Sequence, residues 1–362
     1  MALPHSISTR DSIKQAYTQK TRRLYLLLAA CIAVTILAVI IAVCIGSADL
    51  TPLEVGSSIL SFLFPHAHPI ADEVKFNIVW ELRLPRIILA VLAGAGLSMS
   101  GVVMQALTRN PLVSPFTIGI SNAAAFGASL SIILGARYLG SGQIAITIGA
   151  FCSAALCAVL VYSISAKKQM SAVAIVLTGT ALTYLYSALT NTVQYTTNDD
   201  KLAAVVRWTF GSFSGSTAQQ ILVLGILTAV LLPVFLRYSW ALNALSSGGD
   251  DIAKGLGINA SRVRILLGAL SVVLTACIVS FSGVIGFVGI VGPHIARLLI
   301  GADHKFLLPF SGIFGGLLTL AADTIGRTLF APVVIPVGIV VAYIGVPIFL
   351  HLILSKREMY FQ

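Results

Sequence analysis

The sequence predicts an all-α, polytopic membrane protein that crosses the bilayer about ten times, with both termini in the cytoplasm. Three observations support this: 57% of the 362 residues are hydrophobic, only 10% are charged, and the apolar residues gather in long runs. A soluble domain usually has about a quarter of its residues charged, which is enough to solvate its surface. The composition therefore excludes an ordinary soluble enzyme, a disordered chain and a secreted disulfide scaffold.

The transmembrane helices are predicted from apolar runs, because a helix needs about 20 apolar residues to cross about 30 Å of hydrocarbon. Such runs lie at 24–46, 84–107, 115–134, 142–165, 171–195, 218–236, 306–329 and 335–354. The stretch 263–300 is too long for one crossing, and several glycines and Pro293 interrupt it. We expect two spans there, joined by a tight turn near 282–286, which makes ten in all.

The placement of charge tests this topology. The chain has 23 Lys and Arg against 13 Asp and Glu, a net charge of +10. Basic residues before the first span put the N-terminus inside, and alternating sides from there places 16 of the 23 basic residues in the cytoplasm. The excess is therefore explained by cytoplasmic loops rather than by nucleic acid. We expect a cytoplasmic N-terminal segment (1–23), a transmembrane domain (24–355) with a long cytoplasmic loop at 238–262, and a cytoplasmic tail (356–362), a possible tag remnant.

Two short strings recur at nearly the same offset. Ser98-Met99-Ser100-Gly101-Val102 matches Ser280-Phe281-Ser282-Gly283-Val284, and Arg86-Ile87-Ile88-Leu89 matches Arg264-Ile265-Leu266-Leu267. On the predicted topology, the span with the first copy begins outside and the span with the second begins inside. Inverted repeats of this kind are typical of transporters, but matches of small residues alone are common in membrane helices.

Longer strings carry a resemblance to a known family. Leu82-Arg83-Leu84-Pro85-Arg86 leads into a Gly/Ala-rich helix, Asn110-Pro111-Leu112 follows it, and Gly286-Phe287-Val288-Gly289-Ile290-Val291-Gly292-Pro293-His294 comes later. With Ala322-Asp323-Thr324, Ile335-Pro336-Val337-Gly338 and Gly345-Val346-Pro347, this order and spacing resembles the permease subunits of the FecCD family over about residues 20–356.

The resemblance implies the permease of a type II ABC importer with the fold of cobalamin permeases. It also implies a homodimer in the bilayer, with two ATP-binding subunits on the cytoplasmic face and a substrate-binding protein outside. We expect an iron–siderophore type chelate as cargo, with cobalamin or haem as the alternative. The sequence contains no Gly-x-x-x-x-Gly-Lys-Ser/Thr loop, so ATP and magnesium are expected on the partner ATPase and no cofactor on this chain.

The loop at 238–262 contains a candidate ATPase-coupling site. Its core is predicted as a short helix, with acidic residues at its start and glycine after its end. The resemblance implies a coupling helix that fits a cleft in the ATPase, whereas the residues alone suit a solvated amphipathic loop equally well. The candidate residues are Gly249, Asp250, Asp251, Ile252, Ala253, Lys254, Leu256 and Gly257.

Seven basic residues fall on the outer side, against the charge rule, and three of them are candidates for docking: Arg83 and Arg86 at the start of the second span, and Arg327 at the end of the ninth. The resemblance implies that they receive acidic residues of the binding protein, and the arginine fork suits a carboxylate. The alternatives are snorkelling at the interface, or an internal ion pair of Asp323 with Arg327 at i, i+4 spacing.

The resemblance also implies a cytoplasmic gate and a pathway wall. The gate residues would be Asn110 and Leu112 after the second span, and Ala172 and Val173 at the start of the fifth; tight inter-helix loops would look the same. The pathway residues would be Thr178, Thr183, Ser187, Asn191 and Gln194. Their rough i, i+4 spacing is equally that of packing hydroxyls.

Other chemistry is not favoured. The five cysteines form no Cys-x-x-Cys pair, which argues against a disulfide framework or a metal site. His66 and His68 in the first outer loop are treated as incidental. An ion-coupled secondary transporter would need paired ionisable groups at mid-membrane, and an intramembrane enzyme would need a nucleophile with its base; neither pattern is found.

Overall fold

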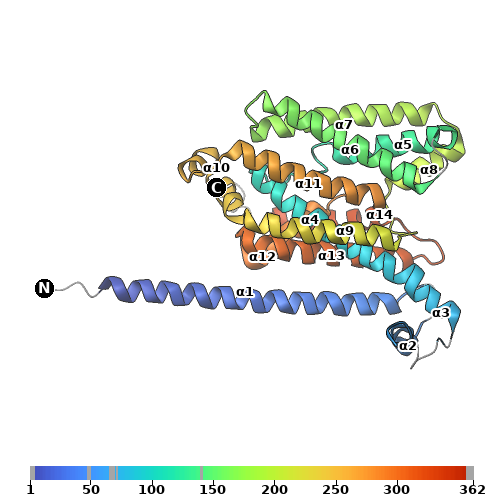
Figure 1. The fold of residues 1–362 in the computed structure, drawn as a ribbon, viewed down its shortest axis with the longest axis horizontal. Helices are drawn as coiled ribbons and strands as arrows, with labels where there is room; N and C mark the ends of the chain where they lie inside the picture. Colours follow the sequence, from blue (N-terminus) through green and yellow to red (C-terminus); the bar gives the residue numbers. More distant parts are fainter. Residues whose placement is uncertain (1–4, 47–49, 65–69, 71, 139–141, 356–362) are drawn as a thin grey trace.

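The computed structural model describes residues 5–46, 50–64, 70, 72–138 and 142–355, and within these ranges the chain is helical without a strand (Figure 1). The helices are α1 (His5–Cys44), α2 (Pro52–Leu63), α3 (Glu73–Asn77), η1 (Ile78–Arg83), α4 (Leu84–Thr108), α5 (Ile120–Tyr138), α6 (Gln143–Ala166), α7 (Ala172–Tyr195), α8 (Asp199–Thr209), α9 (Ala218–Arg237), α10 (Ser239–Gly255), α11 (Ala260–Ser282), α12 (Val288–Ile300), α13 (His304–Thr328) and α14 (Val337–Ser355). The predicted tail (356–362) and His66 and His68 lie outside the described residues.

The predicted spans are confirmed as helices. Among the described residues, seven helices are long and apolar enough to cross a membrane, and three shorter apolar helices lie at Ile120–Leu134, Val288–Ile300 and Val337–His351. The long stretch 263–300 is indeed two helices, because α11 ends at Ser282 and α12 begins at Val288. Gly283 has a φ of 71°, a value that favours glycine and ends the first of them.

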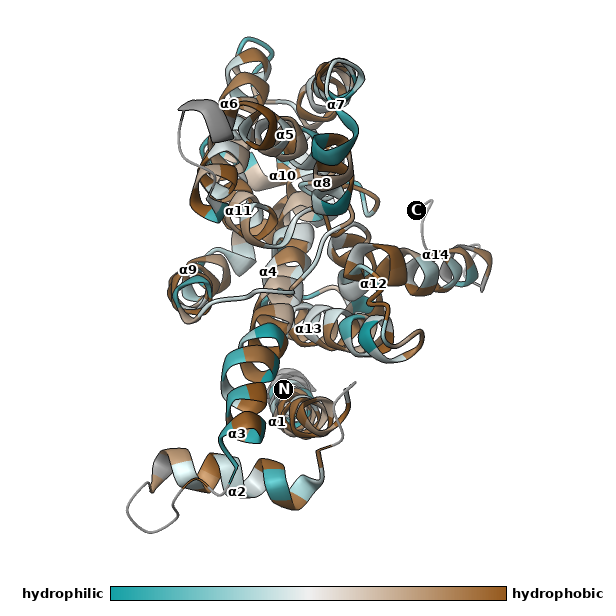
Figure 2. Cartoon of the chain, turned by 90° about the vertical axis from the view of Figure 1, so that its right-hand side faces the viewer, coloured by the Kyte–Doolittle hydropathy of each residue, from teal (hydrophilic) through white to brown (hydrophobic). Residues whose placement is uncertain are grey.

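The core is built around α4, which lies at the centre of the bundle (Figure 2). Of the 18 most apolar consecutive residues in the segment Glu73–Thr108, which ends in α4, 78% are buried; the corresponding share is 72% in α13 and 11% in α1. Small residues bring the backbone of α4 close to those of α12 and α13. A side chain at Gly101 would collide with the backbone of Gly289 in α12, and one at Gly94 with that of Gly315 in α13. Close packing of this kind holds membrane helices together, because lipid tails leave no hydrophobic driving force between them.

The two repeated strings lie on neighbouring antiparallel helices. Arg264 at the start of α11 contacts Leu107 at the end of α4, and about two turns further into both helices the Ser100 hydroxyl donates to the carbonyl of Ser271, 3.3 Å away. Further along, Gly96 approaches Ile278. Two matching helices that run in opposite directions through the core have the geometry expected of an inverted repeat.

The structure adds helices that the apolar runs did not predict. Helix α1 begins at His5 rather than at residue 24, and α2 and α8 are short helices between spans, whereas α3 and η1 extend the helical segment of α4 back to Glu73. Local caps start two of them: Thr51 and Glu54 form a capping box on α2, and the Asn198 side chain accepts from the Lys201 backbone N–H on α8. These helices are too short or too polar to register as spans.

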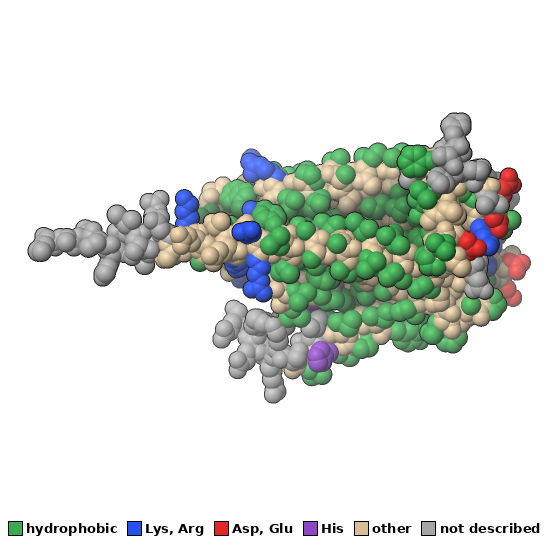
Figure 3. Space-filling view, turned by 90° about the horizontal axis from the view of Figure 1, so that it is seen from below, with side chains coloured by type: hydrophobic (Ala, Val, Ile, Leu, Met, Phe, Trp, Pro, Cys, Tyr) green, Lys and Arg blue, Asp and Glu red, His purple; other side chains and the backbone are tan. Residues whose placement is uncertain are grey.

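Charged residues gather at the two ends of the bundle. Lys and Arg gather at the end from which α1 projects, and Asp and Glu at the opposite end (Figure 3). We call them the basic end, which contains α10, and the acidic end, which contains α2, α3 and α8. This segregation agrees with the predicted assignment of loops to two sides.

Candidate functional site

The candidate coupling residues lie at the basic end, in the second half of α10. Helix α10 is broken at Gly249, whose φ of 69° and ψ of −158° are a conformation that residues with a Cβ rarely adopt. A Cβ there would also lie 2.7 Å from a guanidinium nitrogen of Arg109. The helical residues 250–255 after the break, with Leu256 and Gly257, are called the coupling helix below. As predicted, it begins with acidic residues, Asp250 and Asp251, and glycine follows its end at Gly257.

The coupling helix presents an apolar pair to the outside. Ile252 is 53% exposed and Leu256 is 60% exposed, and four residues of spacing put them on one face. Asp251 and Lys254 are also exposed, whereas Ala253 is fully buried against the bundle. The helix is therefore anchored on one side and offers both apolar and charged groups on the other.

Arg264, in the first turn of α11, connects the coupling helix to the bundle. Its side chain is 2% exposed and makes a bidentate pair with Asp250, at 2.6 and 2.8 Å. Its Nε donates to the carbonyl of Leu107 at 3.0 Å, and Nη1 donates to that of Met170 at 3.4 Å. These hydrogen bonds from Arg264 hold the pKa of the Asp250 carboxyl below its usual range. We call these four residues the Arg264 cluster.

The candidate gate residues flank this cluster in the chain. Asn110 and Leu112 follow Leu107 at the end of α4, where the Asn110 side chain accepts from the Leu112 N–H at 2.9 Å. Ala172 and Val173 follow Met170 and begin α7. Leu112 is 47% and Val173 is 67% exposed. Sequence reasoning did not connect Arg264 with either segment, and the gating role stays a prediction.

At the acidic end, two of the three candidate docking arginines are buried and hold the end of α1. Arg83 is 6% exposed and donates to the carbonyls of Val43 and Cys44, at 2.6 and 3.0 Å. Arg327 is 8% exposed and donates to the carbonyl of Ala42. The last carbonyls of a helix have no partner within it, and cations there also complement the helix dipole. We had expected these side chains on the outer surface.

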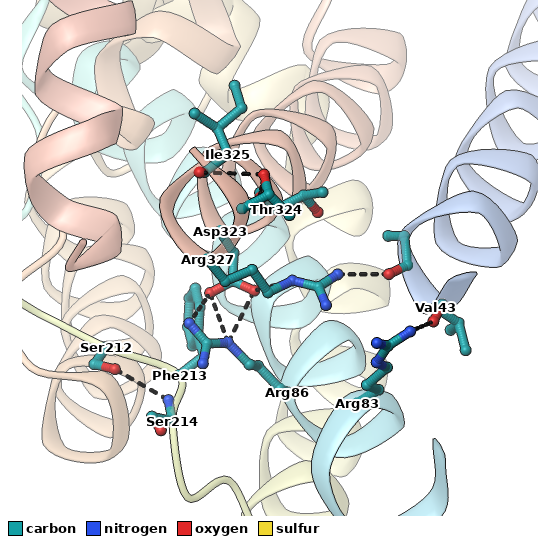
Figure 4. A network of polar contacts seen from close by, with 12 residues as sticks. Val43, Arg83, Arg86, Ser212, Phe213, Ser214, Asp323, Thr324, Ile325 and Arg327 are labelled. Carbon is teal, nitrogen blue, oxygen red and sulfur yellow. Dashed lines mark hydrogen bonds and ion pairs between the residues drawn. The ribbon is translucent and has the colours of Figure 1, made fainter. Parts of the chain in front are cut away.

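The third arginine, Arg86, pairs with Asp323 (Figure 4). Its Nε lies 2.9 and 3.0 Å from the two carboxylate oxygens, and the Asp323 side chain is fully buried. Arg327 lies 3.7 Å from the same carboxylate, so the predicted i, i+4 ion pair exists, but Arg86 is the nearer partner. We call these three residues the Asp323 cluster. All three arginines are thus engaged within the chain, and docking of a binding protein stays a prediction.

The candidate pathway residues lie along α7. Thr178, Thr183, Ser187 and Gln194 are half-buried, and Asn191 is exposed. The Thr183 hydroxyl donates to the carbonyl of Gly179 within its own helix, at 2.9 Å. Large hydrophobic side chains of α7 that are exposed include Val173, Leu177, Tyr184 and Tyr195. The predicted stripe therefore lies mainly beside this exposed face rather than on it, and its role in a pathway is untested.

Within the described ranges, no group of three or more His, Cys, Asp or Glu side chains is placed to hold a metal ion. The polar groups brought together at the two ends are ion pairs and helix caps, which position helices. An arrangement of packed apolar helices with charged clusters at both ends is that of a polytopic membrane protein.

Comparison with known proteins gives the family. Residues 34–355 match the FecCD transport family. The Fe(3+)-citrate import system permease protein YfmE of Bacillus subtilis is 35% identical over 93% of this chain and 97% of its own length. The molybdate import system permease protein MolB of Haemophilus influenzae is 39% identical over 77% of this chain and 81% of its own length.

A solved structure agrees. An inward-facing metal-chelate type ABC transporter superposes with a TM-score of 0.79 at 33% identity, covering 91% of this chain and 99% of that one. Other relatives include a hemin permease of Yersinia pestis and a cobalamin permease of Halobacterium salinarum, 36% and 38% identical over 79% and 78% of this chain, and 86% and 74% of their own lengths. This chain belongs to the FecCD transport family and is an ABC importer permease, as its sequence motifs predicted.

Proposed function

We propose that this chain is the translocating subunit of an importer for an iron chelate, located in the cytoplasmic membrane with its basic end inside. Two copies would enclose the path, two ATPase subunits would bind at the basic end, and a substrate-binding protein would deliver cargo to the acidic end. Relatives named for iron citrate and hemin support an iron chelate. Cobalamin is the second candidate, because a cobalamin permease is equally similar.

The observation that carries the proposal is the exposed apolar pair on the coupling helix. Ile252 and Leu256 are more than half exposed at the basic end of the bundle, and an excess of basic residues supports a cytoplasmic location of that end. Lipid cannot cover them there if that end faces water, so a protein partner is the physical solution. An ATPase cleft that receives this short helix would bury both side chains.

An ion-coupled secondary transporter is the rival class. Such a transporter would use an ionisable group at membrane depth that can exchange its partner. Among the described residues, Asp323 is a buried acid of this kind, but two arginines engage its carboxylate. A carboxylate held by two cations is suited to joining helices rather than to binding and releasing a coupling ion.

Replacing Leu256 by Arg tests the proposal. The purified permease should still be inserted and folded, but co-purification of its ATPase subunit should fall by about tenfold, because a charge would enter a desolvated contact. Uptake of radiolabelled ferric citrate into proteoliposomes, with hemin and cyanocobalamin as parallel probes, identifies the cargo.

The matched control is Leu53→Arg, at a leucine of α2 that is 86% exposed at the opposite end. It should leave ATPase co-purification unchanged. Equal co-purification with the Leu256→Arg chain would show that the coupling helix is not the ATPase contact. Failure of the unaltered permease to bind any ATPase would refute the proposed function itself.

A further inference from the structure

An apolar cleft separates part of α1 from the central bundle. It has a volume of about 780 Å³ and is bordered by α1, α4, α9 and α13. On α1, Leu28, Ile32 and Ile36 line it at helical spacing, so one face of that helix points into the cleft. Ile32 and Ile36 nevertheless remain about half exposed, and the opposite wall contains the small residues Ala95 and Gly312. The described side chains therefore do not close this space, and an apolar occupant would fit it.

The cleft is about as deep as one leaflet of a bilayer. Along α1 its lining extends from Tyr25 to Ile36, which at about 1.5 Å per residue is about 16 Å. Along α9 it extends from Thr228 to Arg237, which is about 14 Å by the same rise. Half of a hydrocarbon core about 30 Å thick is about 15 Å. This depth suits acyl chains that enter from one membrane surface and end near the bilayer centre.

The charges of the cleft lie at its basic end. Arg237 is the last residue of α9, Lys305 lies in the first turn of α13, and Ser239 begins α10. The other described residues that line the cleft are uncharged. Two cations and a hydroxyl above an apolar space match a molecule with an anionic head and apolar chains, since basic pockets between membrane helices bind anionic headgroups.

The two cations are available to such a headgroup. Among the described residues, no ion pair joins Arg237 or Lys305 to a carboxylate. The Lys305 ammonium instead lies over the Tyr25 ring, 6.0 Å from its centroid. The acid nearest in sequence, Asp303, caps α13 by accepting from the Lys305 backbone N–H and also accepts from the Asn243 side chain. Its carboxylate is therefore engaged by other groups.

Aromatic residues indicate that this end of the cleft lies at headgroup depth. Tyr25 lines it, Trp240 directly follows Ser239, and both aromatic side chains are about half exposed. Tyr and Trp gather where the bilayer meets water. Arg22, exposed and one turn before Tyr25, adds a further cation, and Lys and Arg predominate at this end of the molecule (Figure 3).

We propose that the cleft binds one anionic phospholipid per chain, taken from the leaflet at the basic end. Arg237 and Lys305 bind its phosphate, the Ser239 hydroxyl is a further donor, and its acyl chains lie between α1 and the bundle. The bound lipid thereby joins α1 to α9 and α13 along the cleft. This inference goes beyond the proposed function and depends neither on the cargo nor on the ATPase.

Native mass spectrometry of the purified full-length permease tests the site. The delipidated protein is titrated with phosphatidylglycerol or with phosphatidylcholine of the same acyl chains. Phosphatidylglycerol should bind at least about fivefold more tightly, because each basic residue near the membrane surface favours an anionic lipid by about that factor. Glycerol 3-phosphate, a headgroup without chains, should not compete, because burial of the acyl chains supplies much of the binding.

The first pair of variants tests the headgroup contacts. Arg237→Gln combined with Lys305→Gln should weaken phosphatidylglycerol binding by about tenfold or more and change phosphatidylcholine binding by less than about twofold. The matched control is Lys167→Gln combined with Lys168→Gln, which removes the same charge from exposed residues outside the cleft. It should bind phosphatidylglycerol as the parent does.

The second pair of variants tests the chain contacts. Ile32→Trp fills the cleft with an indole and should weaken the binding of both lipids by about tenfold, because displacing two buried CH₂ groups has an effect of that size. The matched control is Val34→Trp, at a residue of α1 that is also about half exposed but does not line the cleft. It should leave the binding of both lipids unchanged.

Each contrary result overturns the proposal. Equal affinity of the parent for the two lipids, or an equal loss in the lysine control, would show that Arg237 and Lys305 do not select the headgroup. Unchanged binding in Ile32→Trp would show that the chains do not occupy the cleft, and competition by glycerol 3-phosphate would indicate a site for free anions instead. Melting temperatures identify variants that fail to fold, and the tryptophan pair decides if the glutamine pair does. Any of these results leaves the proposed import function intact.

Discussion

The two ends of the bundle carry the same chemistry in different settings. Arg86 at the start of α4 and Arg264 at the start of α11 stand at matching positions of the repeated string. Each forms a bidentate pair with an aspartate from another helix, Asp323 at the acidic end and Asp250 at the basic end. The arginine of the repeated string thus forms an ion pair in both copies, once at the acidic end and once at the basic end.

The difference between the pairs lies in the aspartates. The Asp323 side chain is fully buried within α13, and a second arginine also approaches it. Asp250 is about half exposed and follows a break in the backbone. A buried pair on continuous helices fixes their relative position, whereas a pair with one accessible partner can respond to a bound protein. The comparison shows that the repeated string places the same Arg–Asp pair once in a fully buried site and once in a site where the carboxylate is accessible.

The largest effect is expected from breaking the Asp323 cluster. Asp323→Ala leaves Arg86 and Arg327 without their carboxylate in a buried site, which typically costs about 3–5 kcal/mol. Thermal unfolding of the purified permease in detergent should show a clear loss of melting temperature. The matched control is Glu54→Gln, which removes the exposed pair of Glu54 with Lys75 and should leave the melting temperature unchanged. An Asp323→Ala permease as stable as the parent would contradict the structural role of this cluster.

A smaller and local effect is expected at Gly249. Gly249→Ala forces a side chain into a backbone conformation that is close to glycine-only, at a cost of about 1–3 kcal/mol, and against Arg109. Because the coupling helix can shift to relieve the strain, hydrogen exchange of its amides should accelerate while the melting temperature changes little. Gly255→Ala, where a Cβ meets no atom, should leave this exchange unchanged. A global loss of stability in Gly249→Ala would show that the basic end is as rigid as the acidic end.

The smallest effect concerns the exposed pair of Glu54 and Lys75, a third setting for the same kind of contact. The hydrogen bond from Lys75 lowers the pKa of Glu54 to about 2, below its ordinary value of 4.5. A depressed pKa in the folded state means that the pair contributes above about pH 4.5 and loses its contribution as the pH falls towards 2. Trp80, which stacks on Phe62 and donates to the Ser58 carbonyl, reports on this region.

The measurement is the emission of Trp80 in a chain with the other two tryptophans replaced by Phe. Emission should stay constant from neutral pH down to about pH 4 and change only below it. Glu54→Gln should remove this acid transition. A transition centred near the ordinary glutamate value would show that the pair does not persist in solution.

The sequence predicted the spans well because long apolar runs determine them physically. It also located the break between α11 and α12, since Gly283 and its neighbours interrupt a run too long for one crossing. The short helices α2 and α8 were missed because they depend on caps, although Thr51 and Glu54 carried a readable capping signal. Ion pairs between different helices could not be predicted from the sequence. Arg86 and Asp323 are 237 residues apart, and the i, i+4 neighbour Arg327 was the simpler candidate partner for Asp323.

Among the site residues, too, local features could be predicted from the sequence and contacts between distant segments could not. The start and end of the coupling helix follow from the acids at 250 and 251 and the glycines at 255 and 257, which are local signals. The burial of Arg83 and Arg327 could not be foreseen, because the groups that they hold are backbone carbonyls of α1, and any sequence supplies those. An arginine on the outer side, where basic residues are rare, therefore predicted that its guanidinium has a partner, but not that the partner is the backbone of α1.

The loose attachment of α1 has a consequence for the behaviour of the protein in different membranes. Arginines hold its last carbonyls, and Tyr25 packs edge-on against Phe306 nearer the other end. Between these attachments lies a largely apolar cleft of about 780 Å³ bordered by α1, α4, α9 and α13. Acyl chains fill such a space as readily as leucine side chains do. We therefore expect a change of bilayer thickness to alter the tilt of α1 before it disturbs the packing of the central helices.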